Sequence, residues 1–522
     1  MSATVANPIP LHERITPLTR TIVTICVMLA TLMQALDSTI ANVALPYMQG
    51  TLSANSDQIN WVLTSYVVAA AIMTAPVGWM SARFGTKNVL TVSLIGFTVT
   101  SMLCGVAGSI GEMVIFRFLQ GVFGAALVPL SQSTLLNIYP IEKRGSAMSI
   151  WGMGVMLGPI LGPTLGGYLT DLYNWRYVFF VNLPFGILAT IGVIIFMSKD
   201  DDKPVPGFDW TGFAILGIAL AGLQLALDRG ETKDWFGSNE VICETVIAAL
   251  GFYLFTVHML TSNKPLLPKG IFTDRNMLSA ILMMFLVGLV LLSSSALLAP
   301  YLQRLSGYSV RSAGLEMAPR GFGTMAAMMI CGRLGTKVDV RLQMLVGIVL
   351  LLLSLYWMTL WTPDVSSNWI ITVIVVQGFG IGAVFMPLQM IAFATLNPAL
   401  RGDGAAAMSL TRNVGMAIGT SVSSAIVTQM SQYEHAVLSW FITPFAHPFT
   451  TNAMRMLDPT TSLGAQQMDA MIQRQASIIG YGDAFKALMI SSVPCLFLLL
   501  LMRKPKAAPK PAEPGETHMA MD

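Results

Sequence analysis

The sequence predicts an all-α protein that crosses a lipid bilayer many times. Three observations lead to this prediction: 54% of the 522 residues are hydrophobic and only 11% are charged, apolar runs of about 20 residues recur along the chain, and Lys and Arg gather in alternate connections between those runs. A helix of about 20 residues spans the hydrocarbon core of a bilayer, whereas soluble domains carry about 25% charged residues.

Composition also excludes several classes of function. The net charge of +3, without a basic stripe interleaved with aromatic residues, excludes a nucleic-acid partner. The five cysteines each stand alone in a different apolar segment, so they predict neither a metal site nor a disulfide framework. No HExxH, P-loop or paired-His pattern supports a membrane-embedded enzyme. The first apolar run is too long for a cleaved signal peptide and is expected to remain as an anchor.

Fourteen apolar runs predict fourteen transmembrane helices. The connections on one side of these helices hold most of the 30 Lys and Arg, and positively charged loops stay in the cytoplasm. Both termini, residues 1–20 and a disordered tail over 503–522, are therefore predicted to be cytoplasmic. The predicted spans are 21–45, 61–81, 88–108, 112–136, 146–169, 178–198, 210–228, 240–260, 277–302, 313–332, 342–361, 369–395, 405–430 and 484–502.

Internal repetition predicts two homologous six-helix halves with two additional helices between them. The segment ARFGTK at 82–87 returns as GRLGTK at 332–337, and Arg144-Gly145 returns as Arg401-Gly402. Both repeats are separated by about 250 residues, and the helices within 210–260 have no counterpart. The predicted domains are an N-terminal bundle over 21–198, a cytoplasmic linker over 199–209, two inserted helices over 210–260, and a C-terminal bundle over 277–502 with a long outer loop at 432–483.

A single acidic residue, Asp37, interrupts the first apolar run in the stretch LDSTIANVALP. A charge at that depth costs about 2.5–3.5 kcal/mol on insertion scales, so it needs a partner, a water-filled cavity or a proton. One interpretation is a neutral, hydrogen-bonded helix contact, and the other is a carboxyl that binds and releases a proton during transport. Arg117, within the fourth run, is the predicted partner, either in a static ion pair or in one that couples protonation to helix movement.

Two glycine-containing motifs predict sites of conformational change. In the fifth run, GMGVMLGPILGPTLGG spaces glycines by four residues on one helix face, and its prolines permit bending, which indicates a hinge between the bundles. The basic turn GWMSARFGTK at 78–87 is either a cytoplasmic anchor or a latch between the halves. The residues predicted to act in these motifs are Gly78, Arg83, Gly85, Lys87, Gly154, Gly158, Pro159, Gly162, Pro163, Gly166 and Gly167.

Polar side chains within the apolar runs are candidates for a substrate cavity. The 35 methionines suit a pocket that repacks around varied ligands, although methionine is also ordinary filler. Glu244 either faces substrate or has a peripheral structural role, and Glu316 is predicted to bridge Arg320 four residues on. Arg412 lines the pathway or extends to the membrane surface. The cavity candidates are Gln34, Asn42, Gln120, Gln132, Glu244, Arg320, Gln389 and Arg412.

Taken together, these motifs resemble those of the major facilitator superfamily, and within it the fourteen-helix drug:proton antiporters of the EmrB/QacA-like branch, most closely the EmrB subgroup. LDSTIANVALP resembles the first-helix signature of that branch, RFLQG at 117–121 its fourth-helix motif, and the segment 158–167 its antiporter motif. WRYVFFVNLPFG at 175–186 and LDRGETKDWF at 227–236 are similar to stretches of EmrB-like proteins. The likeness extends over about residues 20–505. One departure is Ala82, where the family usually has an acidic residue, which weakens the predicted latch.

The resemblance implies alternating access, in which two halves rock around a midplane cavity. It implies proton-coupled export of hydrophobic or amphipathic drug-like compounds, driven by the proton motive force with no cofactor or metal. It also implies a bacterial inner membrane, a periplasmic adaptor like EmrA and an outer-membrane channel of the TolC type, with the loop 432–483 as the expected adaptor contact. The alternatives that remain open are export of one specific metabolite, lipid or siderophore, and a receptor that only binds its outer partner.

Overall fold

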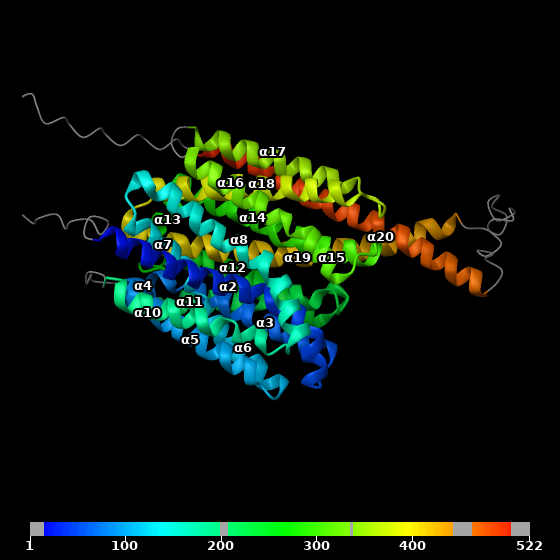
Figure 1. Cartoon of the computed structure of the whole chain (residues 1–522), viewed down its shortest axis with the longest axis horizontal. Helices are drawn as coiled ribbons and strands as arrows, with labels where there is room; N and C mark the ends of the chain where they lie inside the picture. Colours follow the sequence, from blue (N-terminus) through cyan, green and yellow to red (C-terminus); the bar gives the residue numbers. More distant parts are fainter. Residues whose placement is uncertain (1–14, 199–206, 335–337, 442–461, 503–522) are drawn as a thin grey trace, which may run out of the picture.

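All regular structure in the described part of the chain is helical, and the long helices lie side by side with their axes roughly aligned (Figure 1). The computed structural model describes residues 15–198, 207–334, 338–441 and 462–502. The predicted tail over 503–522, and most of the predicted linker and of the N-terminal segment, lie outside these residues.

The helices of the first half begin at Pro17, where the Thr16 side chain accepts a hydrogen bond from the backbone N–H of Thr19. They are α2 (Pro17–Thr51), α3 (Ser56–Thr74), α4 (Val77–Phe84), α5 (Thr86–Val106), α6 (Ile110–Gly124), α7 (Leu127–Ile138), α8 (Ile141–Leu172), α9 (Tyr177–Phe180) and α10 (Asn182–Phe196).

The inserted helices are α11 (Trp210–Gly230) and α12 (Asn239–Thr261), joined through a short 3-10 turn, η1 (Trp235–Gly237). α11 lies against both α3 of the first half and α19 of the second, whereas α12 packs chiefly on α11. The additional pair therefore touches both halves through one of its two helices.

The second half begins at the short α13 and ends at α21. Its elements are α13 (Lys269–Thr273), α14 (Arg275–Pro300), η2 (Tyr301–Leu305), α15 (Val310–Met317), α16 (Pro319–Leu334), α17 (Val340–Thr359), α18 (Ser367–Ala394), η3 (Pro398–Leu400), α19 (Arg401–Trp440), α20 (Ser462–Ser492) and α21 (Pro494–Leu501).

All fourteen predicted spans overlap helices, and several of them are interrupted near prolines. In the described residues, ten helices are long and apolar enough to cross a membrane, or eleven if α3 and α4, bent by 57°, form one span. The helical conformation is interrupted between α3 and α4 at Ala75-Pro76, and between α15 and α16 at Ala318-Pro319. Pro129 follows the break between α6 and α7 and lacks the N–H that would bond the carbonyl of Ala125. The number fourteen stays a prediction.

The expected loop over 432–483 is helical at both of its ends, which corrects its predicted extent. α19 continues to Trp440 and α20 begins at Ser462, and only 442–461 lie outside the described residues. The two extensions are joined by packing of Gly480 on Ser431 and by a hydrogen bond of 2.8 Å between His435 and Asp469. Beyond these contacts, α20 projects past the neighbouring helices in Figure 1.

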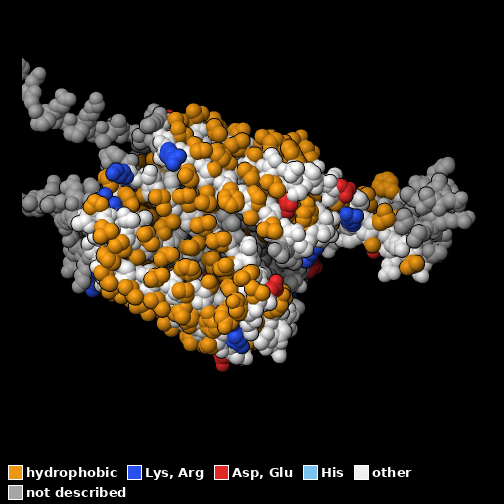
Figure 2. All heavy atoms as spheres, in the orientation of Figure 1, with side chains coloured by type: hydrophobic (Ala, Val, Ile, Leu, Met, Phe, Trp, Pro, Cys, Tyr) orange, Lys and Arg blue, Asp and Glu red, His pale blue; other side chains and the backbone are white. Residues whose placement is uncertain are grey.

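Hydrophobic side chains cover most of the face shown in Figure 2, while Lys, Arg, Asp and Glu gather toward its two ends. Large apolar side chains such as Val92, Ile195 and Tyr253 are more than half exposed. A broad apolar belt between charged ends is the surface that a bilayer requires. The chain is a multi-pass membrane protein.

Candidate functional site

Asp37 of α2 and Arg117 of α6 form a buried ion pair. The Nη1 atom of Arg117 donates to Oδ2 of Asp37 at 2.7 Å, and both residues are 0% exposed. The predicted partnership between these two charges is confirmed. Neither charge is left unpaired in the apolar interior, where an isolated ion would cost several kcal/mol.

Two amides complete the hydrogen bonding of the Asp37 carboxyl. Nε2 of Gln120 donates to Oδ1 of Asp37 at 2.9 Å, and Nδ2 of Asn182 donates to the same oxygen at 3.1 Å. Asn182 also donates to Ser101 at 3.0 Å. Residues from α2, α6 and α10 therefore meet at one carboxyl, with Ser101 of α5 one hydrogen bond further away. The shape of the network depends on the charge of that carboxyl.

Arg117 is anchored on its other side by α3. Its Nε atom donates to the carbonyl oxygen of Val62 at 3.1 Å, and its guanidinium carbon lies 4.2 Å from the centroid of the Tyr66 ring. Nη1 of Arg117 also donates to Oε1 of Gln120 at 2.8 Å. The guanidinium thus keeps a carbonyl, an amide oxygen and an aromatic face whatever the state of Asp37.

Asn182, Tyr66 and Ser101 belong to the network but were not predicted from the sequence. Asn182 lies within WRYVFFVNLPFG, a segment that was singled out only for its resemblance to related proteins. A single neutral amide in an apolar run is a weak signal, because buried amides often serve only to join helices. The network formed by Asp37, Arg117, Gln120, Asn182, Ser101 and Tyr66 is called the carboxyl network below.

The glycine motif of α8 packs directly on the helix that carries Asp37. A Cβ at Gly158 would meet the carbonyl carbon of Ala35 at 2.4 Å, and one at Gly162 would meet Oγ1 of Thr39 at 2.1 Å. Oγ1 of Thr39 donates to the carbonyl oxygen of Gly158 at 3.1 Å. α8 runs unbroken through positions 159 and 163. Movement of α8 against α2 would therefore act on residues two positions from Asp37.

The two halves meet at the end of the molecule where α4 joins α5 and where α16 ends at Leu334. Nε2 of Gln132 on α7 donates to Oε1 of Gln389 on α18 at 2.5 Å, and Oγ of Ser149 on α8 donates to the carbonyl oxygen of Met328 on α16 at 2.9 Å. The rings of Trp151 and Phe385 stack 6.0 Å apart. These contacts close the interface between the halves at this end.

The predicted latch takes a different form from the one expected. Among the described residues, Arg83 and Lys87 make no ion pair, and Arg83 is exposed. The contact with the other half is made instead by Gly78, where a Cβ would overlap the carboxyl of Asp403 on α19. Gly85 has φ of 83°, a left-handed conformation that favours glycine, and joins α4 to α5.

The remaining cavity candidates fall into different environments. Nε2 of Gln34 donates to the Tyr66 hydroxyl at 3.4 Å beside the carboxyl network, and Asn42 is exposed. Glu244 accepts from Arg229 at 2.8 Å between α11 and α12, a contact that favours the structural alternative for it. Arg320 donates to Ser294 at 2.8 Å and makes no ion pair with Glu316 among the described residues, so the predicted bridge is wrong.

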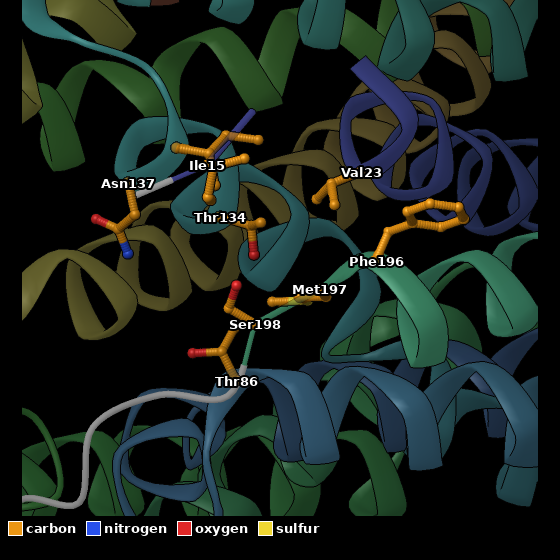
Figure 3. A pocket seen from close by; sticks show the side chains of 9 residues that line it. Ile15, Val23, Thr86, Thr134, Asn137, Phe196, Met197 and Ser198 are labelled. Carbon is orange, nitrogen blue, oxygen red and sulfur yellow. The ribbon is translucent and has the colours of Figure 1, made fainter. Parts of the chain in front are cut away.

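One small pocket lies at the closed end, between α2, α5, α7 and α10 (Figure 3). Its volume of about 20 Å³ holds about one water molecule, so it cannot accept a drug-like compound. A larger apolar groove of about 340 Å³ lies on the surface of the protein between α3, α6 and α11. Its lining includes Trp61, Phe118 and Leu225.

Comparison with known proteins agrees with this architecture. A family model for the Major Facilitator Superfamily matches residues 27–420. The chain is 34% identical over 472 residues to the multidrug export protein EmrB of Escherichia coli K12, covering 89% of this chain and 91% of that one. It is 33% identical over 485 residues to the fatty acid resistance protein FarB of Neisseria gonorrhoeae, covering 91% and 95%.

Among solved structures, the human organic anion transporter MFSD10 has a TM-score of 0.57 with 14% sequence identity, over 93% of this chain and 100% of that one. That likeness shows the shared fold. The family match, the identity to EmrB over most of both chains and the helical architecture together lead to one conclusion: the chain belongs to the major facilitator superfamily, in its EmrB-like branch.

Proposed function

We propose that the chain is a proton-coupled efflux transporter that exports varied hydrophobic and amphipathic compounds by alternating access. Its membership of the superfamily makes it a transporter rather than an enzyme. Relatives at 31–34% identity that are named as multidrug export or resistance proteins support drug-like substrates. The carboxyl network carries the proposal of proton coupling.

The proton acts on Asp37. While ionised, the carboxylate accepts a charge-assisted hydrogen bond from Arg117, and such a bond is about twice as strong as a neutral one. Uptake of a proton cancels that attraction, and Arg117 keeps its bonds to Val62 and Gln120. The attraction between α2 and α6 then weakens, so the two helices can move relative to each other. Release of the proton restores the ion pair.

The described arrangement is the state closed toward the cytoplasm. The positive-inside rule assigns the connections 82–87 and 332–337 to that side, and the contacts between the halves gather there. Asp37 takes its proton from the outer side in this state. The glycine face of α8 then permits the rocking movement by which the closed end opens.

The proton motive force supplies enough free energy for concentrative export. An inward charge yields about 2.3 kcal/mol per 100 mV of membrane potential, and a tenfold concentration gradient costs about 1.4 kcal/mol. One proton at about 100 mV therefore sustains a gradient above tenfold for a neutral compound.

The test is substrate-stimulated proton flux in proteoliposomes. Asp37→Asn is expected to abolish the flux, because the amide cannot titrate but can fill the same space. The matched control is Asp171→Asn, which changes an exposed acid on α8 outside the carboxyl network. Full proton-dependent export by Asp37→Asn, at normal abundance, would overturn the proposal.

We propose the inner membrane as the location, with fourteen spans and both termini in the cytoplasm. The support is the charge asymmetry of the connections and the overlap of every predicted span with helix. Reporter fusions at the two ends of the chain test it, since a reporter active only in the periplasm must stay inactive at both.

A periplasmic adaptor and an outer-membrane channel of the TolC type are the proposed partners. The projecting ends of α19 and α20 offer exposed apolar side chains, with Trp440 87% and Phe441 75% exposed, outside the segment that a bilayer would cover. We assign these residues to the adaptor contact. Trp440→Ser with Phe441→Ser should reduce co-purification of the adaptor and spare the fold. Undiminished co-purification would remove the assignment.

A second candidate is export of one specific metabolite, lipid or siderophore. The identity of 33% to a protein named for fatty acid resistance favours it. A deletion strain tested against a panel of unrelated compounds separates the two: sensitivity to many supports multidrug export, and sensitivity to one class supports the alternative.

A further inference from the structure

The last turn of the inserted helix α11 binds the first half through Asp228. Oδ2 of Asp228 accepts a hydrogen bond from the Thr64 hydroxyl of α3, and Oδ1 accepts one of 2.9 Å from Nε2 of Gln224 on α11 itself. A hydroxyl that donates to a carboxylate makes a stronger bond than one that donates to a neutral group. A polar side chain therefore ties α11 to α3, in addition to apolar packing.

The same end of α11 binds the second half through Leu227 and Glu231. The carbonyl oxygen of Leu227 accepts a hydrogen bond of 2.9 Å from the Ser421 hydroxyl of α19. The carboxyl of Glu231, the residue that follows α11, accepts from Ser424 at 2.7 Å and from Thr428 at 2.9 Å. The three donors are spaced by three and four residues, which places their hydroxyl groups on one side of α19. One end of α11 is thus bonded to both halves.

These bonds lie far from the closed end of the molecule. α19 begins at the closed end with Arg401, which donates to Asn137 of α7 at 3.0 Å. Ser421 follows Arg401 by 20 residues, or about 30 Å of helix. Thr64 lies in the half of α3 that precedes the contacts with α4 and the closed end.

Nearer the closed end, the same three helices are joined by apolar packing. Ala71 and Ala75 of α3, Leu216 and Leu220 of α11, and Leu410 of α19 belong to one buried cluster. A rocking movement about the closed end changes the spacing of α3 and α19 most at their opposite ends. The hydrogen bonds of Asp228 and Glu231 lie toward those ends, so they oppose separation of the halves most directly.

The second inserted helix is attached to the same end of α11. Arg229 pairs with Glu244 of α12 at 2.8 Å and with Glu240 at 2.9 Å. Both ion pairs stay within the inserted helices and do not reach either half. They attach α12 to α11 beside Asp228, so the inserted pair moves as a unit.

We propose that the end of α11 is an outer strap, which holds α3 and α19 together through Asp228 and Glu231 and limits how far the halves separate on the outer side. The proposal rests on the proposed alternating access and gives the inserted helices a role in it. Asp228 and Glu231 are exposed, so water can replace the hydroxyl donors when the halves move, and the bonds can break and form again in each cycle.

The test is the distance between spin labels on cysteines introduced at Gly111, near the start of α6, and at Asn368, near the start of α18, in the purified full-length chain in nanodiscs. Both positions are exposed. Cys243 is replaced by serine, because it is exposed whereas the other four cysteines are buried. Glu231→Ala removes two bonds to α19 and should raise the population at longer distances about threefold or more, a moderate effect because Glu231 is exposed to water.

Release of either attachment should have the same effect. Thr64→Val keeps the shape of the side chain and removes the donor to Asp228, so it should lengthen the distances as Glu231→Ala does, and the two changes together should add little. The control is Glu240→Ala, since the ion pairs of Glu240 with Arg229 and Lys233 stay within the inserted helices. It should leave the distances unchanged.

Two outcomes would overturn the proposal. The first is an unchanged distance distribution in both Thr64→Val and Glu231→Ala. The second is an equal lengthening by Glu240→Ala, which would assign the effect to the inserted pair itself and not to its bonds with the halves. If Glu231→Ala lowers the melting temperature, Ser424→Ala with Thr428→Val removes the same two bonds from the side of α19 and is judged by the same criteria.

Failure of the proposed function has a separate signature, because the distances are measured without transport. A chain whose distances lengthen in these variants but that shows no proton-coupled export would keep the outer strap and lose the transport proposal. A chain that exports compounds with protons but whose distances do not respond would lose the outer strap alone.

Discussion

Gln132 of α7 and Gln389 of α18 join the two halves through a buried hydrogen bond of 2.5 Å. The residues are 1% and 2% exposed, so neither amide has water as an alternative partner at this interface. The bond lies at the closed end of the molecule, together with the stacked rings of Trp151 and Phe385. Opening of this end must therefore expose both amides to new partners.

Gln132→Ala is predicted to favour the opened arrangement. It leaves the amide of Gln389 buried without its partner, which costs about 1–3 kcal/mol in the closed state only. The distance between spin labels at Asn88 and Leu342, exposed positions at the start of α5 and α17, should lengthen in a larger fraction of molecules. An unchanged distance distribution would show that this bond does not hold the closed state.

Gly158→Ala is predicted to destabilise the protein, whereas Gly154→Ala should be tolerated. The new methyl group at 158 meets the backbone of Ala35, which cannot move aside, while the one at 154 meets only the flexible end of Met28. Overpacking of this kind costs about 1–3 kcal/mol. The melting temperature of the purified protein should fall for Gly158→Ala alone. Gly314→Ala, with nothing within 4 Å, is a further control.

The charges of Asp37 and Arg117 are predicted to be strongly coupled. Arg117→Met leaves a buried carboxyl without its cation, at a cost of about 3–5 kcal/mol, whereas Asp37→Asn with Arg117→Met removes both charges together. The double variant should melt well above the temperature expected from adding the two single losses. Glu240→Gln at the half-exposed pair with Arg229 should have almost no effect. Additive losses at Asp37 and Arg117 would contradict the coupling.

Residues with a strong sequence signal were placed correctly, and residues with a weak one were missed. Asp37 and Arg117 are charged residues in apolar runs. Because an unpaired charge is costly there, their pairing could be predicted from the sequence. Asn182 and Tyr66 are ordinary members of apolar segments, and only the packing of α3 and α10 brings them to the network. The pairing of Arg320 with Glu316 failed because the helix breaks at Ala318-Pro319, which removes the regular four-residue spacing between them.

The basic turn 78–87 shows that a sequence motif does not determine which residues of the other half it contacts. The basic turn 78–87 was expected to act through Arg83 and Lys87, and its missing acid at Ala82 weakened that expectation. The structure supplies an acid from the opposite half, Asp403, in the first turn of α19, ahead of the predicted span 405–430. A sequence repeat identifies the turn, but only the docking of α4 on α19 shows which residue faces it.

The contact between Asp403 and Gly78 is predicted to depend on pH. Burial raises the pKa of the Asp403 carboxyl from 3.8 to about 6. A raised pKa means that the closed contact binds a proton more tightly than the separated state, so the contact is most stable below about pH 4 and weakens as the pH rises to about 6. Above pH 6 the carboxyl is ionised in both states, and no further change is expected from it.

The same spin labels at Asn88 and Leu342 measure this dependence, in an Asp37→Asn background so that the carboxyl network does not contribute. The closed population should fall between pH 4 and pH 6 and then level off. Asp403→Asn should abolish the change and hold the closed population near its low-pH level throughout, because a neutral side chain of the same size stays against Gly78 at every pH. A pH dependence that persists in Asp403→Asn would assign it to another group at this end of the molecule.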